Sequence, residues 1–192
     1  MAKHVCPWWV GYLLASPLRR LFHNPDTILA PFVKSGMTVL DIGPGMGFFT
    51  LPMAAMVGPA GKVVCVDVQE RMLRSLEKRA RAAHLTERIV IHACGPTTLG
   101  LDDFERKFDF VLAFAVVHEV PDPHRFLAEV AMGLKTEGTC LLVEPCGHVT
   151  ARDFEATLAL AAATGLTIVA QPAIPRSRTA ALKKTREAGA VA

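Results

Sequence analysis

A glycine-rich turn that follows an acidic strand residue is the clearest chemical pattern in the sequence. Asp41 stands near the end of an apolar run, and Gly43, Gly45 and Gly47 follow it at alternate positions. Glycines at such a turn admit positive φ and let the backbone approach a ligand closely. The dinucleotide fingerprint G-x-G-x-x-G, counted from Gly43, is disfavoured because its last glycine falls on Phe48. The turn therefore predicts a ligand site at the carboxyl end of this strand, but not a site for a nicotinamide dinucleotide.

A second group of reactive side chains follows two later apolar runs, 108–114 and 140–143. Its members are His118, Glu119, Glu144, Cys146 and His148. The ends of parallel strands meet at one edge of a sheet, so we expect these side chains on the same rim as the glycine turn. Histidine titrates near neutral pH and can take a proton from a substrate. We interpret His118, Glu119 and His148 as candidate catalytic residues, although each could instead order a loop.

Glu144 and Cys146 are candidates for the wall of a substrate pocket. A metal site built from this group is not expected, because the spacing of its cysteine and histidine residues matches no zinc pattern. The sequence thus predicts a site of organic side chains beside a ligand-binding turn.

The elements that must position these residues alternate between strand and helix. Strands are expected at 38–42, 62–66, 88–92, 108–114, 140–143, 166–170 and 179–183. Helices are expected at 49–56 and 69–84, and two more begin near Asp122 and Thr150. Such alternation predicts right-handed βαβ units and a sheet covered on both faces. The fold class is α/β: a Rossmann-like three-layer sandwich whose seven-stranded, mostly parallel sheet has an antiparallel last strand.

The length of 192 residues suits one compact domain. Within it we expect an N-terminal helical cap, residues 1–35, and a cofactor-binding domain, residues 36–192. The cap includes an apolar helix near residues 7–22 that carries Trp8, Trp9 and Tyr12. These aromatic side chains either form an apolar wall of the substrate pocket or pack in the core.

Composition and charge exclude several classes of protein. A content of 51% hydrophobic and 20% charged residues is incompatible with a disordered chain. The longest apolar runs fall short of the roughly 18 residues that span a bilayer, so no membrane span is expected. Five cysteines without a C-x-x-C spacing indicate a reducing compartment, and we predict a cytoplasmic protein. The net charge of +3 does not by itself imply nucleic acid.

The glycine turn and three later segments resemble the class I S-adenosylmethionine-dependent methyltransferases. Residues 63–67 resemble the second strand of that family, ending in Asp67, and residues 108–112 resemble its fourth strand. Residues 117–122, Val-His-Glu-Val-Pro-Asp, resemble the L-H-H-V-x-D segment, and residues 134–139 resemble the turn before the fifth strand. The resemblance covers about residues 36–184 and is strongest to the small "type 11" branch related to quinone-biosynthesis methyltransferases.

The resemblance implies S-adenosylmethionine as cofactor and methyl transfer to a small acceptor, apolar or planar, as the reaction. It implies that Asp67 accepts hydrogen bonds from both ribose hydroxyls, which suits a carboxylate. The cofactor-binding residues that it implies are Asp41, Gly43, Gly45, Gly47, Asp67, Val68, Cys94 and Ala113. One departure concerns residues 92–97, His-Ala-Cys-Gly-Pro-Thr, which lack the acidic residue that the family often directs at adenine.

Two alternatives stay open at this point. A nucleic-acid methyltransferase would use the basic cluster near the C-terminus, but residues 113–116 do not match the Asn/Asp-Pro-Pro-aromatic segment of such enzymes. A non-catalytic protein that binds S-adenosylmethionine is the other alternative, because methyl transfer leaves no invariant catalytic signature in a sequence. The sequence does not indicate an oligomeric state.

Overall fold

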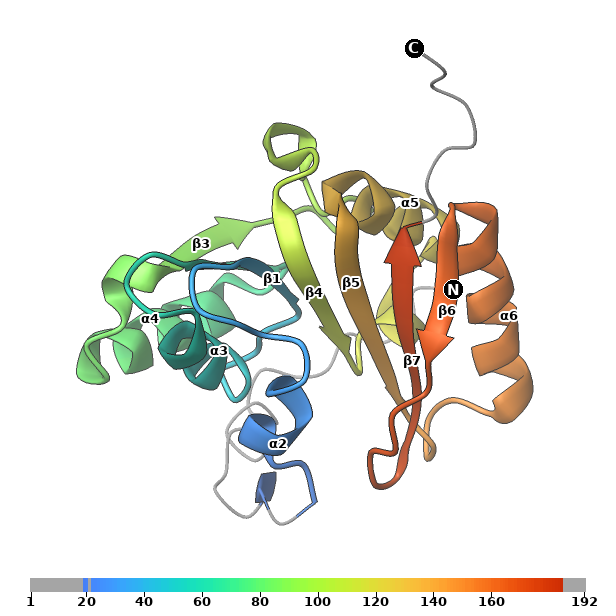
Figure 1. Ribbon diagram of the computed structural model, residues 1–192, viewed down its shortest axis with the longest axis horizontal. Helices are drawn as coiled ribbons and strands as arrows, with labels where there is room; N and C mark the ends of the chain where they lie inside the picture. The colour runs from blue at the N-terminus through green and yellow to red at the C-terminus, as the bar shows by residue number, and fades with distance from the viewer. Residues whose placement is uncertain (1–18, 21, 185–192) are drawn as a thin grey trace.

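The computed structural model describes residues 19–20 and 22–184. These residues form one seven-stranded sheet in the order β3-β2-β1-β4-β5-β7-β6, which Figure 1 shows from one side. The strands are β1 (Thr38–Ile42), β2 (Lys62–Asp67), β3 (Ile89–Ala93), β4 (Phe108–Phe114), β5 (Leu134–Pro145), β6 (Leu166–Ala170) and β7 (Ser177–Lys184). Only β7 runs antiparallel to its neighbours, β5 and β6. The predicted fold class is therefore confirmed.

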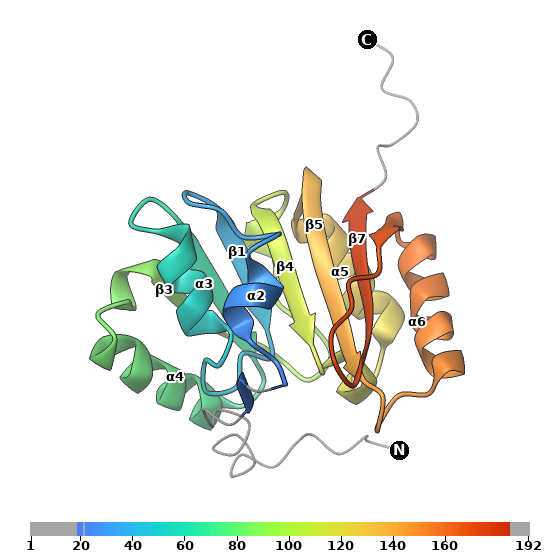
Figure 2. The same ribbon diagram turned by 60° about the horizontal axis from the view of Figure 1, so that its bottom comes forward.

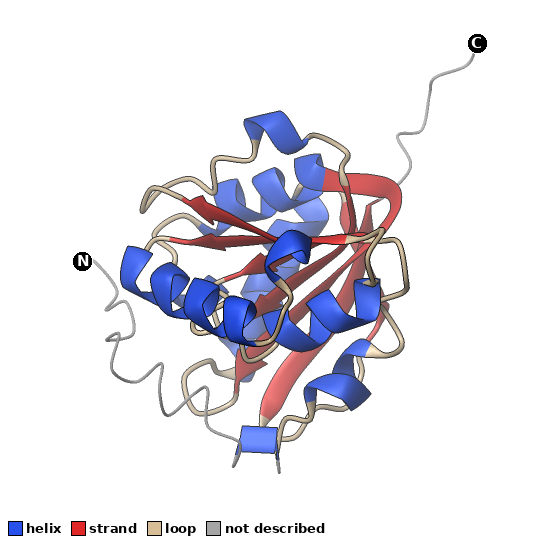
Figure 3. Cartoon of the chain, turned by 90° about the vertical axis from the view of Figure 1, so that its left-hand side faces the viewer, coloured by secondary structure: helices blue, strands red, loops and turns tan. Residues whose placement is uncertain are grey.

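Helices cover both faces of the sheet, as Figures 2 and 3 show. The α-helices are α2 (Pro25–Leu29), α3 (Thr50–Val57), α4 (Glu70–Ala82), α5 (Pro123–Gly133) and α6 (Ala151–Ala163). Short 3₁₀ turns are η2 (Thr86–Arg88), η3 (Asp102–Phe104) and η4 (Val117–Glu119). Helices α5 and α6 pack on one face of the sheet, and α2, α3 and part of α4 pack on the other. Successive side chains of a strand point to opposite faces, so the central strands contribute to both cores.

Local sequence signals explain where several helices begin. The Asp122 side chain accepts from the Arg125 amide at 3.0 Å and caps α5, with Pro123 at the first helical position. Thr150 and Asp153 form a capping box at the start of α6. Asn24 likewise caps α2 ahead of Pro25. The caps at Asp122 and Thr150 lie shortly after the ends of β4 and β5, where the site lies.

The observed elements differ from the predicted ones mainly in the reach of β5. This strand begins at Leu134 rather than Cys140, because Leu134 pairs with Phe108 across an irregularity in the register. The connection from β3 to β4 carries the short turn η3 where a longer helix would complete a βαβ unit. As a result β3 is only partly covered, and Val90 is 41% exposed.

In the part of the chain that the structure describes, helices are too short or too polar to cross a bilayer. The predicted apolar wall of Trp8, Trp9 and Tyr12 lies outside the described residues, as does most of the expected N-terminal helix. The division into a cap and a cofactor-binding domain thus stays a prediction.

Candidate active site

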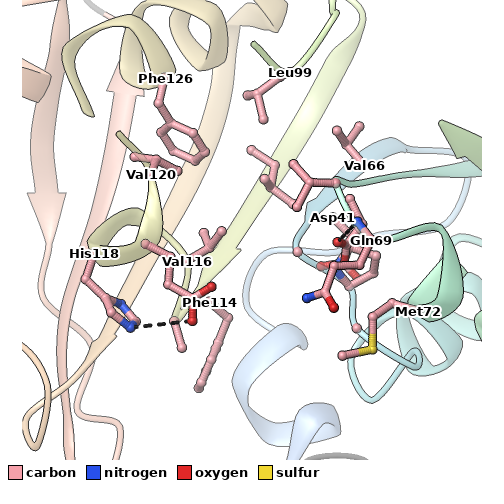
Figure 4. Close-up of a pocket in the computed structure, with 18 of the residues that line it drawn as sticks. Asp41, Val66, Gln69, Met72, Leu99, Phe114, Val116, His118, Val120 and Phe126 are labelled. Carbon is pink, nitrogen blue, oxygen red and sulfur yellow. Dashed lines mark hydrogen bonds and ion pairs between the residues drawn. The ribbon is translucent and has the colours of Figure 1, made fainter. Parts of the chain in front are cut away.

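A cavity of about 820 Å³ opens at the carboxyl ends of β1, β2 and β4. Figure 4 shows His118 on one side of this cavity and Gln69 and Met72 on the other, with Phe114 between them. Its volume lies within the range of small-molecule and cofactor sites. The position agrees with the predicted ligand site at the carboxyl ends of the strands.

The glycine turn between β1 and α3 forms one wall of the cavity. Gly43 and Gly45 line it with φ of 66° and 55°, in the left-handed region that favours glycine. A Cβ atom on Gly45 would meet nothing within 4 Å, so this glycine serves the backbone conformation. Gly47, with φ of 89°, has a different role, because its Cβ would lie 2.5 Å from the Leu76 Cδ1 atom of α4. The turn therefore combines an open face toward the cavity with close packing behind it.

Asp41 lines the bottom of this wall and is only 2% exposed. The Thr50 hydroxyl, in the first turn of α3, donates to its Oδ2 atom at 2.6 Å. Burial raises the pKa of Asp41 to about 7, and this hydrogen bond opposes the rise. Near neutral pH this carboxyl group can therefore be either ionised or protonated.

Asp67, at the end of β2, presents a second carboxyl group to the cavity. The Gln69 amide donates to its Oδ1 atom at 2.8 Å. Burial raises the pKa of Asp67 to about 6, and backbone hydrogen bonds from Gln69 and Gly45 oppose the rise. Two neighbouring residues extend this wall: Val68, which is 43% exposed, and Cys94, whose amide donates to the Asp67 carbonyl at 3.2 Å. This wall can accept hydrogen bonds from a polar ligand and pack against its apolar part.

On the opposite side, His118 is held by a buried carboxylate. Glu144, at the end of β5, is 1% exposed, and its Oε2 atom lies 2.5 Å from His118 Nδ1. Its Oε1 atom accepts from the amides of Val116 and Val117 at 3.2 and 2.9 Å. The carboxylate accepts at Nδ1, so in a neutral imidazole the proton lies there and the lone pair lies on Nε2. In that form the ring can take a proton at Nε2.

Two further ionisable residues stand beside this pair. Glu119 Oε1 lies 3.9 Å from His118 Nε2, and the rings of His148 and His118 have their centroids 5.6 Å apart. His118, Glu119 and His148 all line the cavity. The structure thus brings together the three residues that the sequence nominated as catalytic, while their roles remain predictions.

Aromatic rings and an arginine complete the wall between the two sides. The Arg19 guanidinium lies 4.6 Å from the ring centroid of Phe48 and 5.2 Å from that of Phe114. Burial lowers the pKa of Arg19 to about 10, while the charge of Asp41 opposes this change. The His23 ring meets Phe114 edge to face, at 5.2 Å between centroids. Aromatic rings of this kind can pack against the apolar part of a ligand.

Four of the described residues nominated from the sequence lie away from the cavity lining. Gly47, expected to bind the cofactor, faces Leu76 of α4 instead. Ala113 is fully buried in the core between the sheet and α5, and the residues after it, Phe114 to Val116, line the cavity instead. Glu144 stands behind His118 and is too enclosed to form a pocket wall. Cys146 is exposed, and its amide donates to the Arg176 carbonyl in the neighbouring turn.

Several cavity residues were not nominated from the sequence, among them the charged Arg19 and Glu129. Glu129 belongs to α5, and Arg19 comes from the segment before α2, so neither adjoins a recognisable motif. Their common signal is a charged side chain beside apolar neighbours in the chain, which many surface residues share. Among the described residues, no group of three potential ligands is placed to hold a metal ion.

The family model described as "Methyltransferase domain" matches residues 33–185. A demethylmenaquinone methyltransferase of Lactobacillus johnsonii is 31% identical over 112 residues, which are 58% of this chain and 45% of that protein. The ubiquinone/menaquinone biosynthesis C-methyltransferase UbiE of Pasteurella multocida is 29% identical over 118 residues, 62% of this chain and 43% of that protein. The chain spans about half the length of the curated relatives that it matches.

Solved structures match over most of the chain. A SAM-dependent methyltransferase from Aquifex aeolicus superimposes with a TM-score of 0.84 at 22% identity, covering 94% of this chain and all of that one. An S-adenosyl-L-methionine-dependent methyltransferase from Methanococcus maripaludis, itself described as putative in its function, gives a TM-score of 0.75 at 14% identity, with 96% and 97% covered. At these identities the structures show that the fold is shared.

Proposed function

This chain belongs to the family of methyltransferase domains, and on that premise we propose that it transfers the methyl group of S-adenosylmethionine to a small-molecule acceptor. One observation carries the proposal. A single cavity holds the glycine turn and Asp67 on one side and the His118–Glu144 pair on the other. The first side suits a ribose-bearing cofactor, and the second suits an acceptor that must lose a proton.

The residues on the first side fit S-adenosylmethionine. The Asp67 carboxylate, which is anchored by the Gln69 amide, would accept from both ribose hydroxyls. The open backbone at Gly43 and Gly45 admits the amino-acid part of the cofactor, because no Cβ atom blocks its approach. When bound, S-adenosylmethionine supplies a methyl group already activated by the positive sulfur. The chain then has to align the acceptor with that methyl group, and alignment alone can lower a barrier by about 7–11 kcal/mol.

The acceptor that we propose is planar and largely apolar. The rings of Phe48 and Phe114, both beside the Arg19 guanidinium, give this cavity an aromatic wall. Quinol-like molecules meet this description, and the names of the bacterial relatives give independent support to that substrate class.

His118 is the residue that we propose to move the proton. Glu144 holds the Nδ1 side of the ring, which leaves Nε2 to accept a proton from a hydroxyl of the acceptor. The Val116 and Val117 amides and the His118 ring all donate to Glu144, so this carboxylate is fixed before the acceptor binds. His118 would touch the acceptor, whereas Glu144 would act through His118 as a positioning residue.

Calorimetry and methyl transfer would test the proposal together. We expect S-adenosylmethionine and S-adenosylhomocysteine to bind, and NAD not to bind. With methyl-labelled S-adenosylmethionine, we expect label to be transferred to members of a panel of quinols and phenols. Failure of both sulfur ligands to bind would refute the cofactor assignment. Binding without transfer to any compound of the panel would refute the proposed acceptor class.

A further inference from the structure

The loop after β3 lies beside the ribose end of the cavity, and it contains no acidic residue. Residues 94–99 all line the cavity, and an isolated bridge between Gly95 and Thr98 folds them back on themselves. A carboxylate nevertheless reaches this loop from another element. It belongs to Glu129, on α5, and it too lines the cavity.

The Glu129 carboxylate is fixed by three donors. Its Oε2 atom accepts from the Leu99 amide at 2.6 Å and from the Thr98 hydroxyl at 3.1 Å. Its Oε1 atom accepts from Arg125 Nε at 3.1 Å. Each carboxylate oxygen can accept about two hydrogen bonds, so Oε2 is filled whereas Oε1 has room for another donor. The Glu129 side chain is 15% exposed and is part of the cavity lining.

The position of Glu129 relative to Asp67 follows from the sheet. Strands β2 and β3 are parallel neighbours in which Asp67 pairs with Ala93, so Cys94 lies next to the ribose-binding carboxylate. Asp67 and Glu129 both raise the pKa of the Cys94 thiol, which burial raises to about 11, so both charges are close to this residue. A base attached to a ribose at Asp67 would therefore extend along the β3 loop toward Glu129.

Apolar side chains line the same cavity as the two carboxylates. They are Val68 after β2, Met72 in α4, Leu99 in the loop and Phe126 in α5; Figure 4 shows Met72, Leu99 and Phe126 around the cavity. A flat base would lie between these side chains, and its edge would meet Glu129. The polar edge of adenine carries an amino group at the 6-position, which is a donor.

We propose that Glu129 recognises the 6-amino group of adenine and makes this site selective for adenine over its 6-oxo counterpart, hypoxanthine. This inference rests on the proposed function, since it assumes a bound S-adenosyl ligand. An ionised carboxylate only accepts hydrogen bonds, so it pairs with an amino group and repels the carbonyl oxygen of hypoxanthine. Glu129 thus supplies from α5 an acidic group that the loop after β3 lacks.

The test compares S-adenosylhomocysteine with S-inosylhomocysteine, which differs only in the base, by calorimetry on the full chain. We expect the natural chain to bind the adenine ligand about 10- to 100-fold more tightly, because the 6-oxo ligand replaces a donor with a carbonyl oxygen that faces the carboxylate. In Glu129→Gln, the amide oxygen must face the Leu99 amide, which cannot turn away. The amide nitrogen then replaces Oε1, and Arg125, whose side chain is 55% exposed, can turn into solvent. We expect the preference to disappear or to invert toward the 6-oxo ligand.

Two further variants separate recognition from support of the loop. Glu77→Gln makes the same chemical change on the exposed face of α4 and should leave both affinities unchanged. Glu129→Asp keeps an acceptor-only group and should retain the preference for adenine even where its affinity is lower. Thermal unfolding establishes that each variant is folded.

Several outcomes would overturn the inference. Equal affinity of the natural chain for both ligands, or an unchanged preference in folded Glu129→Gln, would show that Glu129 only supports the loop. Loss of the preference in folded Glu129→Asp would show that a carboxylate at position 129 does not select adenine by accepting from its 6-amino group. Failure of the natural chain to bind either ligand would instead refute the proposed function, which keeps the two failures distinguishable.

Discussion

The two sides of the cavity are built in different ways. The cofactor side depends on neighbours in the chain, because the turn from Gly43 to Gly47 follows β1 directly and the Gln69 amide caps Asp67 two residues away. The acceptor side depends on distant residues. Glu144 is 26 positions from His118, and His23 contacts the carbonyl of Pro175 across 152 positions.

The two sides of the cavity should therefore differ in the substitutions that they tolerate. A local turn keeps its shape as long as its own residues permit the required φ and ψ values. His118 is in η4, which follows β4, and Glu144 ends β5, so their pairing needs β4 and β5 in register and the Glu144 carboxylate buried behind the ring. The cofactor side can therefore be shared among chains that bind different acceptors, whereas the acceptor side can change with the substrate. We expect variants on the two sides to separate ligand binding from turnover.

The largest expected effect is on the acceptor side. In His118→Ala, the rate at which a quinol or phenol is methylated should fall about 10²- to 10⁴-fold, because the group that takes the proton is gone. The affinity for S-adenosylhomocysteine should stay within about twofold, since the cofactor side is untouched. His124→Asn, at an exposed position on α5, is the matched control and should change neither quantity. Comparable turnover in His118→Ala would remove His118 from the mechanism.

Glu144→Gln sharpens the same comparison. It keeps the shape of the side chain but weakens the hydrogen bond that fixes His118, so kcat should fall about 10- to 100-fold with little change in KM. A variant that lost stability but kept its kcat would indicate a purely structural Glu144.

On the cofactor side, Asp67→Asn should weaken S-adenosylhomocysteine binding about 100-fold. The carboxylate would make two charge-assisted hydrogen bonds to the ribose, and an amide can accept only at its single oxygen. Calorimetry measures the affinity directly, and Asp103→Asn, at an exposed position in η3, serves as the control. Unchanged affinity in Asp67→Asn would contradict the assignment of the ribose to this residue.

The same contrast explains how much of the molecule was predictable from its sequence. The strands, the capping box at Thr150 and Asp153, and the glycine turn are encoded by neighbouring residues, and the structure contains them. The pairing of Glu144 with His118 and the approach of Glu129 to the β3 loop arise only after the sheet and α5 have packed. No spacing in the chain reports such contacts, so sequence patterns nominated Glu144 as a pocket wall and overlooked Glu129.

The cofactor side should also respond to pH in two opposite ways. Burial raises the pKa of Asp67 to about 6 and that of Asp41 to about 7, from an ordinary value of 3.8. Ribose binding needs ionised Asp67, so affinity for S-adenosylhomocysteine should fall below pH 6, by up to tenfold for each pH unit. Asp67→Asn should flatten this dependence, and calorimetry from pH 5 to pH 8 (about one unit beyond each pKa) would measure it. A flat profile in the natural chain would contradict the prediction.

The stability of the ligand-free chain should change in the other direction. Between about pH 4 and pH 7 the folded state holds more protons on Asp41 and Asp67 than the unfolded state does, because both pKa values are raised on folding. The contribution of these two residues to the free energy of unfolding therefore decreases as the pH rises through this window. Thermal unfolding of the natural chain and of Asp41→Asn isolates the contribution, which should be smaller in the variant. An identical pH slope in both proteins would exclude Asp41 as its source.

The smallest expected effect comes from the packing behind the glycine turn. In Gly47→Ala the new Cβ atom would lie 2.5 Å from Leu76 Cδ1, and the residue would have to keep a φ of 89°. The side chain of Leu76 can move, so the cost should be about 1–3 kcal/mol in the free energy of unfolding, most of it from the backbone conformation. Gly147→Ala, where a Cβ atom meets nothing within 4 Å, should cost less than Gly47→Ala. Denaturant unfolding gives both values. Because Gly47 faces α4 rather than the cavity, the folded variant should still bind S-adenosylhomocysteine. Loss of that binding would mean that the cofactor side also depends on the packing of α4 behind the turn.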